Sequence, residues 1–318
     1  MDNKKIIITG GAGFLGKYLV DLFINKGFKN IVVIDKFNTK IDGVNYIQTD
    51  FSDEQVVKPI LKECDTLIHL AATIGVDNCR NHPDLVKQVN LINTKKLFEW
   101  GVKAGIRRII FTSSSEVYGN SKDIPYEENG KLEPISVYGE AKVEVEEYLR
   151  KIQQSSNTTI GISRLFNVYG PGQKKDFVAS IFINAALDNK PLQIFGSGEQ
   201  TRTFTYVEDA AEGIFRVYKY NITPFEIVNL GGQQEYSITQ LAEMVLSLLP
   251  ESISKIEYLR YGQEETRTSN FEIDRRIPSI DKAKRLLDFR AETTLREGLS
   301  KTIHYFQEQQ INYTNTNG

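Results

Sequence analysis

Two stretches in the middle of the chain carry the side chains best suited to chemistry. Thr112 is followed by three serines and a carboxylate, in the run from Ser113 to Glu116. Farther on, Tyr138 and Lys142 are four residues apart, so in a helix they lie on one face. A free tyrosine is a poor base at neutral pH, but a nearby ammonium stabilises its phenolate. The pair therefore predicts a general acid/base that moves a hydroxyl proton while hydride leaves the same carbon.

A glycine-rich loop near the start of the chain predicts a dinucleotide site. A β-branched run at 6–8 is typical of a buried parallel strand, and Gly10, Gly13 and Gly16 follow it before an apolar helical pattern. Gly10 allows a tight turn, Gly13 lets a pyrophosphate approach the backbone, and Gly16 lets the helix pack closely. The helix N-terminus then faces the phosphates with free N–H groups. The spacing is G-x-x-G-x-x-G rather than G-x-G-x-x-G, so a tight turn without a ligand is the competing interpretation.

The second strand supports the dinucleotide interpretation. An apolar run at 31–34 ends in Asp35, about 20 residues after the glycine loop, where a carboxylate can accept from both ribose hydroxyls. The same carboxylate would repel a 2′-phosphate, which favours NAD over NADP. Lys36 lies beside it and would soften that repulsion.

Strands and helices alternate along the first half of the chain. Strands are predicted at 4–9, 30–34, 45–48, 66–70, 107–113 and 159–166, and helices at 14–26, 53–62, 84–104 and 137–154. This order predicts an α/β fold with a doubly wound parallel (Rossmann) sheet, which binds ligands at the carboxyl ends of its strands. Residues 1–169 are predicted to form the NAD-binding domain, with 205–222 returning to it, and residues 170–318 a smaller α/β substrate-binding domain. In the second half, helices are predicted at 177–187, 237–249 and 280–287, and a strand at 193–195.

Several polar residues lie at or near the strand ends. Asp50 is expected to accept from an adenine amino group or, equally, to belong to a helix N-cap region. His69 falls inside an apolar strand and is expected to be a hydrogen-bonded core histidine. Ala71 and Ala72 leave space for a flat cofactor. Asn90 is expected to be buried and to bond to the backbone of a neighbouring strand.

Composition narrows the function classes. The 318 residues are 40% hydrophobic and 25% charged, with a net charge of −2, which favours neither a nucleic-acid surface nor a membrane surface. Cys64 and Cys79 are the only cysteines, so a disulfide framework is excluded, and the three histidines show no metal-binding spacing. The sequence therefore predicts a cytoplasmic protein without a metal site.

Taken together, the motifs resemble the extended short-chain dehydrogenase/reductase superfamily, in its nucleotide-sugar epimerase/dehydratase branch. The matching segments, in the order of the branch, are 9–16, Asp35, 69–72, 111–119, 138–142, 164–173 and 196–211. The resemblance implies bound NAD(H), a nucleoside-diphosphate sugar as substrate, and a homodimer formed by the helices near 84–104 and 137–154.

The resemblance also implies roles for individual residues. Tyr138 is the acid/base, Lys142 its partner, and Ser114 bonds to the reacting hydroxyl. The implied cofactor positions are Gly10, Gly13, Phe14, Leu15, Asp35, Asp50, Phe51, Leu70, Ala71, Ala72, Asn90, Thr112, Tyr138 and Lys142. The implied substrate positions are Ser114, Ser115, Asn167, Leu192, Gln193, Phe195 and Arg202. Leu192 and Phe195 fit a packed edge strand equally well, and the pair Arg275–Arg276 fits either a phosphate contact or an exposed turn.

Glu116 is the residue that bears on the reaction. A glutamate here is similar to the Thr-Ser-Glu of GDP-mannose dehydratases and UDP-glucuronate decarboxylases, where a carboxylate beside C5 or C6 could serve as a base. Its alternative role is to support the serine loop. Other lyase marks are missing, because residue 115 is serine, the segment after Leu70 is not proline-rich, and 170–172 reads Gly-Pro-Gly.

The sequence therefore favours, narrowly, a nucleotide-sugar 4-epimerase. The alternatives are a lyase that uses Glu116 (a 4,6-dehydratase or a uronate decarboxylase) and an NAD(P)H-dependent 4-keto-6-deoxy-sugar reductase. A non-catalytic NAD(H)-sensing regulator is an alternative of another class, and the presence of both Tyr138 and Lys142 argues against it.

Overall fold

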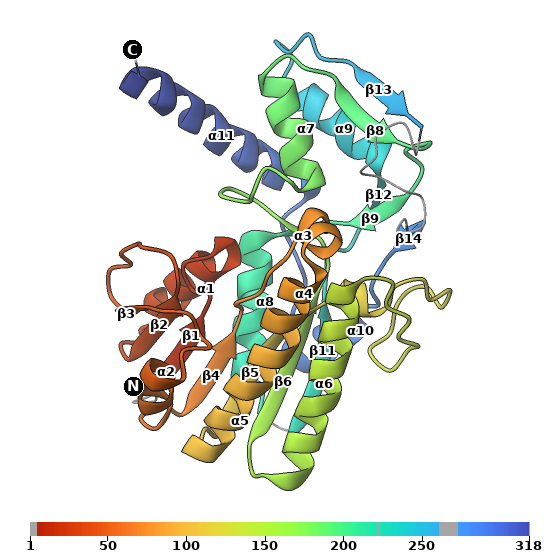
Figure 1. Ribbon diagram of the computed structural model, residues 1–318. Helices are drawn as coiled ribbons and strands as arrows, with labels where there is room; N and C mark the ends of the chain where they lie inside the picture. The colour runs from red at the N-terminus through yellow and green to blue at the C-terminus, as the bar shows by residue number, and fades with distance from the viewer. Residues whose placement is uncertain (1–4, 222, 261–272, 318) are drawn as a thin grey trace.

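The computed structural model describes residues 5–221, 223–260 and 273–317, and it is built on a seven-stranded parallel sheet (Figure 1). The strand order is β11-β6-β5-β4-β1-β2-β3, so the chain winds outward in both directions from β1. The strands are β1 (Ile6–Thr9), β2 (Ile31–Asp35), β3 (Asn45–Gln48), β4 (Thr66–His69), β5 (Arg108–Ser114), β6 (Thr159–Leu165) and β11 (Phe225–Leu230). The predicted doubly wound α/β fold is confirmed.

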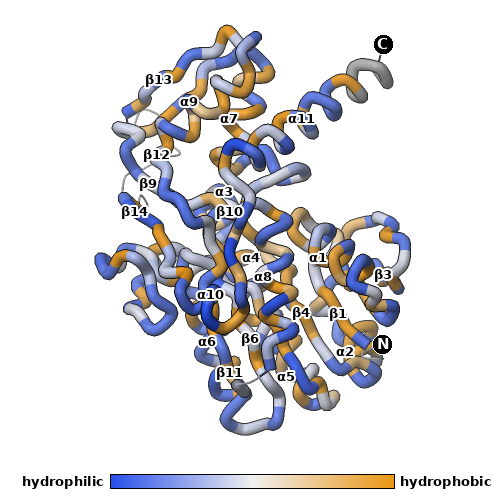
Figure 2. The backbone as a smooth tube through the Cα atoms, turned by 180° about the vertical axis from the view of Figure 1, so that it is seen from behind, coloured by the Kyte–Doolittle hydropathy of each residue, from blue (hydrophilic) through white to orange (hydrophobic). Residues whose placement is uncertain are grey.

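Alternate side chains of each strand enter opposite layers, which explains the uninterrupted apolar runs. On one face, Ile6 and Ile8 pack with Phe23 of α1 (Phe14–Asn25) and Phe215 of α8 (Val207–Lys219). On the other face, Ile7 packs in a second core formed with α2 (Glu54–Leu61), α5 (Thr94–Ala104) and α6 (Val137–Ser155). Figure 2 shows the hydrophobic colouring along the strands that lie between these layers.

The predicted helix at 84–104 is helical throughout, but it is not a regular α-helix along its whole length. The structure divides it into α4 (Pro83–Lys87), a π-helical segment (Gln88–Asn93) and α5, and places a further short helix, α3 (Val76–Asn81), before it. The wider π turn carries Asn90, whose side chain reaches back to the loop after β4. Periodicity alone does not distinguish such a π turn from an α-helix.

The smaller domain is built on short strands and three helices above the carboxyl ends of the sheet (Figure 1). Its helices are α7 (Val178–Leu187), α9 (Ile238–Leu248) and α11 (Leu295–Asn317). Its strands form β8 (Leu192–Phe195) with β13 (Ile256–Leu259), and β9 (Thr201–Thr203) with β12 (Glu235–Ser237) and β14 (Arg275–Arg276). Ser237 caps α9 in a reciprocal capping box with Gln240, which explains why that helix was predictable.

The chain passes between the two parts more than once. The short pair β7 (Val168–Tyr169) and β10 (Thr205–Tyr206) lies where it leaves the sheet, and α8 and β11 bring it back. Helix α10 (Asp281–Leu287) packs against α8 and β11. The predicted strand at 193–195 corresponds to β8, whereas β11 and the other short strands of the small domain were not predicted. Lys4 of the predicted first strand lies outside the described residues. Within the described ranges, no helix is long and apolar enough to cross a membrane.

Candidate active site

The end of β5 and the start of α6 meet at the carboxyl edge of the sheet. Ser114 Oγ accepts the N–H of Glu116 at 3.2 Å, which starts a short 3-10 helix (Ser115–Val117). Ser136 caps α6 by accepting the N–H of Gly139 at 3.0 Å. A Cβ on Gly139 would lie 2.7 Å from the carbonyl oxygen of Glu116, so glycine here lets the helix start directly against the serine turn.

Tyr138 and Lys142 lie on the face of α6 that covers the end of β5. Lys142 is 2% exposed, and its Nζ donates to the carbonyl of Thr112 at 2.8 Å. The ammonium lies 4.4 Å from the centre of the Phe111 ring and 5.4 Å from that of Tyr138. The fold thus brings the predicted acid/base pair and the serine turn together.

The ionisation of this pair differs from the sequence expectation. Burial and the charge of Glu116 raise the pKa of Tyr138 well above its usual value, against a lowering by hydrogen bonding to Ser114. Burial lowers the pKa of Lys142 to about 7, against an opposing effect of Glu146. Lys142 therefore does not by itself convert Tyr138 to a phenolate in the ligand-free chain. The desolvation of both side chains outweighs the attraction between the ammonium and the phenolate.

Glu116 forms an ion pair that links the two parts of the molecule. Its Oε1 accepts from Arg276 at 2.5 Å and its Oε2 accepts from the Ser136 hydroxyl at 3.2 Å. Burial would raise the pKa of Glu116, but the charge and hydrogen bond of Arg276, the hydrogen bond of Ser136 and the charge of Arg202 bring it below its usual value. The carboxylate is therefore held ionised at the edge of the site.

Two arginines lie side by side on the small-domain sheet. Arg202 of β9 and Arg276 of β14 are register partners, and both act on Glu116 by charge. The side chain of Arg276 is 12% exposed, and its Nε is a buried donor without a hydrogen-bond partner. Arg276 is thus in a strand and ion-paired, which excludes the exposed-turn interpretation, whereas Arg275 is bound to Glu235 at the surface. Two guanidiniums against one carboxylate leave a net positive charge that suits an anionic ligand.

The glycine loop has the shape that a dinucleotide needs. Gly10 has φ +74°, and a Cβ there would lie 2.6 Å from the Ala71 nitrogen. A Cβ on Gly16 would lie 2.1 Å from the Gly10 carbonyl oxygen, whereas one on Gly13 would meet that oxygen only at 3.2 Å. Asp35 braces the loop, because its Oδ2 accepts the N–H of Ala12 at 3.0 Å. These residues fit an NAD pyrophosphate at the start of α1, with Asp35 beside the adenosine ribose.

The other predicted cofactor positions surround this loop in different ways. Phe14 and Leu15 begin α1, Leu70, Ala71 and Ala72 are half-buried after β4, and Thr112 Oγ1 donates to the carbonyl of His69 at 3.0 Å. Asp50 is exposed and accepts from the Ser52 N–H at 2.9 Å, while Asp53 is the actual N-cap of α2. Phe51 is buried against the ring of His69, 4.9 Å between centres.

His69 and Asn90 have structural partners. His69 is fully desolvated between Thr9 Oγ1 and Thr94 Oγ1, and burial and the charge of Lys142 hold its pKa well below the usual value. The prediction of a core histidine is confirmed. Asn90 accepts the N–H of Thr73 at 2.9 Å and donates to its carbonyl at 2.7 Å, so its side chain braces the loop after β4 rather than a strand.

The predicted substrate positions are only partly brought together. Asn167 has φ +37° and donates to the Thr203 carbonyl at 2.8 Å, close to Arg202. Leu192 is fully buried in the small-domain core and Phe195 nearly so, whereas Gln193 is exposed. The Leu192 side chain is thus a core contact, because it belongs to the packed face of β8. Ser115 is also buried, which leaves Ser114 as the more accessible serine of the turn.

One neighbour of the site was not anticipated. Cys79 of α3 is half-buried, accepts a hydrogen bond from the backbone of Tyr138, and has its pKa raised by burial and by Glu116. The contact of Cys79 with Tyr138 depends on the course of the loop after β4, which no local sequence pattern predicts.

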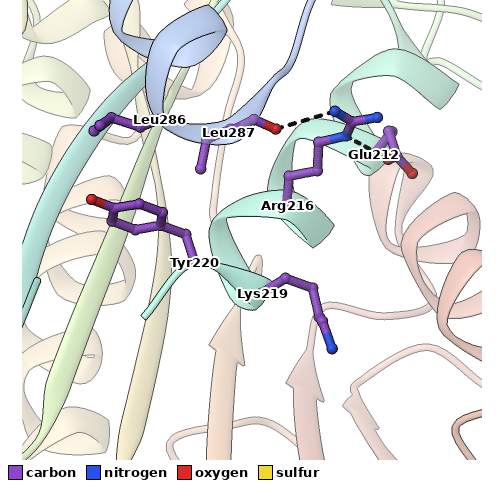
Figure 3. A pocket seen from close by; sticks show the side chains of 6 residues that line it. All are labelled: Glu212, Arg216, Lys219, Tyr220, Leu286 and Leu287. Atoms are coloured by element: carbon purple, nitrogen blue, oxygen red, sulfur yellow. Dashed lines mark hydrogen bonds and ion pairs between the residues drawn. The ribbon is translucent and has the colours of Figure 1, made fainter. Parts of the chain in front are cut away.

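A shallow pocket of about 330 Å³ lies elsewhere, between α8 and α10, and is lined by Arg216, Lys219 and Leu287 among others. Figure 3 shows that Arg216 is occupied there by Glu212 and the Leu287 carbonyl.

A Rossmann sheet with this glycine loop, Asp35 and the Tyr138–Lys142 pair defines a dinucleotide-dependent oxidoreductive enzyme fold. The chain belongs to the NAD dependent epimerase/dehydratase family, whose model matches residues 6–231. It is an NAD-dependent nucleotide-sugar-modifying enzyme of the extended short-chain dehydrogenase/reductase type, and the predicted family is confirmed.

The chain is similar to proteins named as UDP-glucuronic acid decarboxylases and to proteins named as 4-epimerases. UDP-glucuronic acid decarboxylase 1 of Xenopus tropicalis is 34% identical over 97% of this chain and 73% of its own length. The UDP-glucose 4-epimerase of Thermotoga maritima, solved with UDP-glucose, has a TM-score of 0.87 and 27% identity, covering 96% of this chain and 99% of that one. MoeE5 in complex with UDP-glucuronic acid and NAD has a TM-score of 0.86 and 28% identity over 96% of this chain and 99% of that one.

Proposed function

We propose that the protein is a nucleoside-diphosphate uronic acid decarboxylase, with a uridine nucleotide as the expected carrier. The observation that carries the proposal is the ionised Glu116 held by Arg276 and Ser136 beside Tyr138. The relative with 34% identity, named as a UDP-glucuronic acid decarboxylase, supports the same choice. We therefore favour the lyase alternative over the 4-epimerase that the sequence favoured.

The chemistry begins at C4 of the sugar. When bound at the glycine loop, NAD would supply reversible hydride transfer at C4, so no external reductant would be consumed. Tyr138 takes the C4 hydroxyl proton, with Lys142 in its charged form stabilising the phenolate and Ser114 bonding to the oxygen. The product is a 4-ketone with a carboxylate two carbons away, which is a β-keto acid.

Loss of carbon dioxide then leaves an enolate that takes one proton from solvent at C5. Hydride returns to C4, and Tyr138 gives its proton back to the oxygen. Net positive charge from Arg202 and Arg276 is expected to attract the anionic substrate, while the ionised Glu116 is expected to repel its C6 carboxylate and so favour loss of carbon dioxide. Asp35 supports NAD over NADP as the cofactor, since it would repel a 2′-phosphate.

A 4-epimerase remains the second candidate for a specific reason. The segment after Leu70 lacks the proline-rich loop of the decarboxylases, and residue 172 is glycine where they have arginine. In that reaction the same 4-ketone turns over and receives hydride on its other face. A reductase and a non-catalytic NAD(H) sensor are further alternatives.

Product analysis separates these candidates. The purified protein is incubated with UDP-glucuronate, UDP-glucose and UDP-N-acetylglucosamine in D₂O, and products are followed by mass and NMR. The expected result is loss of carbon dioxide from UDP-glucuronate alone and one deuterium at C5. A C4 epimer of unchanged mass, without deuterium, would establish the epimerase. Turnover only with NAD(P)H and a 4-keto sugar would establish a reductase.

Glu116→Gln, with Glu140→Gln on the exposed face of α6 as its matched control, tests the carboxylate directly. We expect the control to be unchanged and decarboxylation to fall about 10²-fold in Glu116→Gln. Wild-type decarboxylation in Glu116→Gln would show that the ion pair only supports the serine turn.

A further inference from the structure

We propose that Glu146 is a positioning residue of the active site: with Arg164 it fixes the Tyr138–Lys142 face of α6 against β5, and its charge favours the protonated form of Lys142. The inference rests on the C4 oxidation step of the proposed function, which the decarboxylase, epimerase and reductase alternatives share. It does not depend on Glu116 or on the fate of the 4-ketone.

The geometry places Glu146 directly behind the site. It is four residues after Lys142 and eight after Tyr138, so all three occupy one face of α6. Glu146 Oε1 accepts from the Ser113 hydroxyl at 2.5 Å, and Ser113 is next to Thr112, whose carbonyl accepts Lys142. The carboxylate therefore ties α6 to the same end of β5 that holds the lysine.

Arg164 of β6 completes this buried arrangement. Its Nε and Nη2 donate to the two oxygens of Glu146 at 3.1 and 2.6 Å, and the side chains are 2% and 4% exposed. Its remaining Nη1 donates to the Tyr118 hydroxyl at 2.7 Å and the Glu128 carbonyl at 3.0 Å. Tyr118 in turn donates to Asn229 of β11 at 2.7 Å. With its donors bound in this way, the arginine fixes the position of the carboxylate.

The negative charge of Glu146 has a second effect, on the protonation of Lys142. The Lys142 ammonium lies over the Phe111 ring and donates to the Thr112 carbonyl, and burial lowers its pKa. Glu146 is the group that opposes this. A neutral Lys142 would give no charge stabilisation to a Tyr138 phenolate, so the carboxylate one turn behind the lysine affects the acid/base residue through it.

Other charged and titratable groups also lie on the elements packed around the lysine. From β4, His69 is neutral and feels the charge of Lys142. From the turn after β5 and from α3, Glu116 and Cys79 act on Tyr138 rather than on the lysine. From α5, Lys95 is paired with Glu144 on the outer side of α6 at 3.1 Å. A change in the protonation of Lys142 is therefore expected to follow from a change at Glu146.

The first experiment measures the pH–rate profile of the C4 reaction in Glu146→Gln. Glutamine keeps an oxygen for Ser113 and Arg164 but carries no charge. The exposed Glu147→Gln on the same helix is the matched control. We expect the alkaline limb to move to lower pH in Glu146→Gln, with kcat at pH 8 reduced about tenfold relative to the control and KM little changed.

A second variant separates charge from folding. Glu146→Leu combined with Arg164→Met replaces the ion pair by apolar groups of similar size, which proteins often tolerate. If the double variant folds and its alkaline limb is shifted like that of Glu146→Gln, the proposal holds. If its profile has the wild-type shape, the pair is merely structural and the proposal is overturned.

A third measurement does not use activity. A double-mutant cycle of Glu146→Gln and Lys142→Met is determined from urea unfolding at pH 6 and pH 9. We expect coupling at pH 6, where Lys142 is charged, and a clearly smaller coupling at pH 9. Equal coupling at both pH values would overturn the proposal, and this result stands even if none of the tested sugars is a substrate.

Discussion

Burial and the charge of Glu116 both hold the proton on Tyr138. For this tyrosine to act as a base, positive charge must be close to its oxygen during the reaction. A protonated Lys142 supplies one such charge, and NAD, when bound, supplies another. Ionisation of Tyr138 is thus expected to follow ligand binding rather than precede it.

Tyr138→Phe tests this role at the level of one atom. We expect kcat to fall by about 10²–10⁴-fold, because only the hydroxyl is removed from the acid/base position. NAD affinity, measured by calorimetry, is expected to stay within a few-fold, since the ring remains. Tyr148→Phe, farther along α6, is the control. A turnover rate close to wild type in Tyr138→Phe would assign the proton transfer to another group.

The lowered pKa of Lys142 predicts a pH dependence of stability. The unfolded chain binds the lysine proton up to its ordinary pKa of about 10.5, whereas the folded chain releases it at about 7. Between these values the unfolded state holds more protons, so stability from this group rises with pH and is lost as pH falls toward 7. The destabilisation is complete below the folded pKa.

Lys142→Met removes the ammonium group and with it this contribution to the pH dependence of stability. We expect the variant to be more stable than wild type at pH 6, and the difference in the free energy of unfolding to shrink as pH rises from 7 to 10. Urea unfolding of both proteins across that range measures it, with Lys151→Met on the exposed surface of α6 as the control. A difference independent of pH would mean that the lysine is not desolvated in solution.

At the level of elements, two glycines of the glycine loop serve different purposes, helix packing and cofactor binding, which the sequence pattern does not distinguish. A Cβ on Gly16 would meet the Gly10 carbonyl oxygen at 2.1 Å, inside the loop itself. A Cβ on Gly13 would lie 3.2 Å from the same atom. Gly16 is thus required for packing of α1 on the loop, whereas Gly13 is expected to leave room for the pyrophosphate.

Alanine at each position tests the distinction. Gly16→Ala is expected to lower stability by about 2 kcal/mol or more, because the helix must move away from the loop. Gly13→Ala is expected to lower the free energy of unfolding by less than Gly16→Ala does, yet to lose at least tenfold in NAD affinity. Thermal unfolding and calorimetry with NAD give both quantities. Strong destabilisation by Gly13→Ala would contradict the assignment.

Elements of the sheet were predictable where local signals agree. The runs at β1 and β2 are β-branched and end in the glycine loop and Asp35, so the pattern and the site indicate the same strands. Strand β11 was missed because its apolar run is short and is interrupted by the polar residues Glu226 and Asn229. The π turn at Asn90 was missed because its cause is a partner, Thr73, that sequence does not place beside it.

The site likewise contains features that the sequence predicts and features that only the folded chain shows. Tyr138, Lys142 and Ser114 were predictable because each lies within one element of known direction. The partnership of Glu116 with Arg276 joins positions 160 residues apart across two sheets, and only the folded chain brings them together. The effect of burial on the pKa of Lys142 likewise depends on layers contributed by other elements.

At the level of the whole molecule, the surface near α4, α5 and α6 carries exposed apolar side chains. Leu85 is 49% exposed and Ile92 is 39% exposed on the stretch before α5. The outer face of α6 carries exposed acidic residues, including Glu140 and Glu147, and α5 carries the exposed Lys96. We propose that a second copy of the chain covers this face, since a two-fold axis would bring the acidic helix of one copy near the basic helix of the other.

Leu85→Asp with Ile92→Asp tests the proposed dimer. Two buried charges without partners are expected to weaken association at least 30-fold, which corresponds to about 2 kcal/mol, and to convert the protein to monomers at micromolar concentration. Sedimentation velocity measures the change, and Ile253→Asp, at a site 80% exposed on the small domain, is the control. A wild-type protein that sediments as a monomer would refute the proposal. If the double variant is monomeric but keeps its kcat, the dimer supports stability only, because each copy supplies its own Tyr138, Lys142 and Glu116.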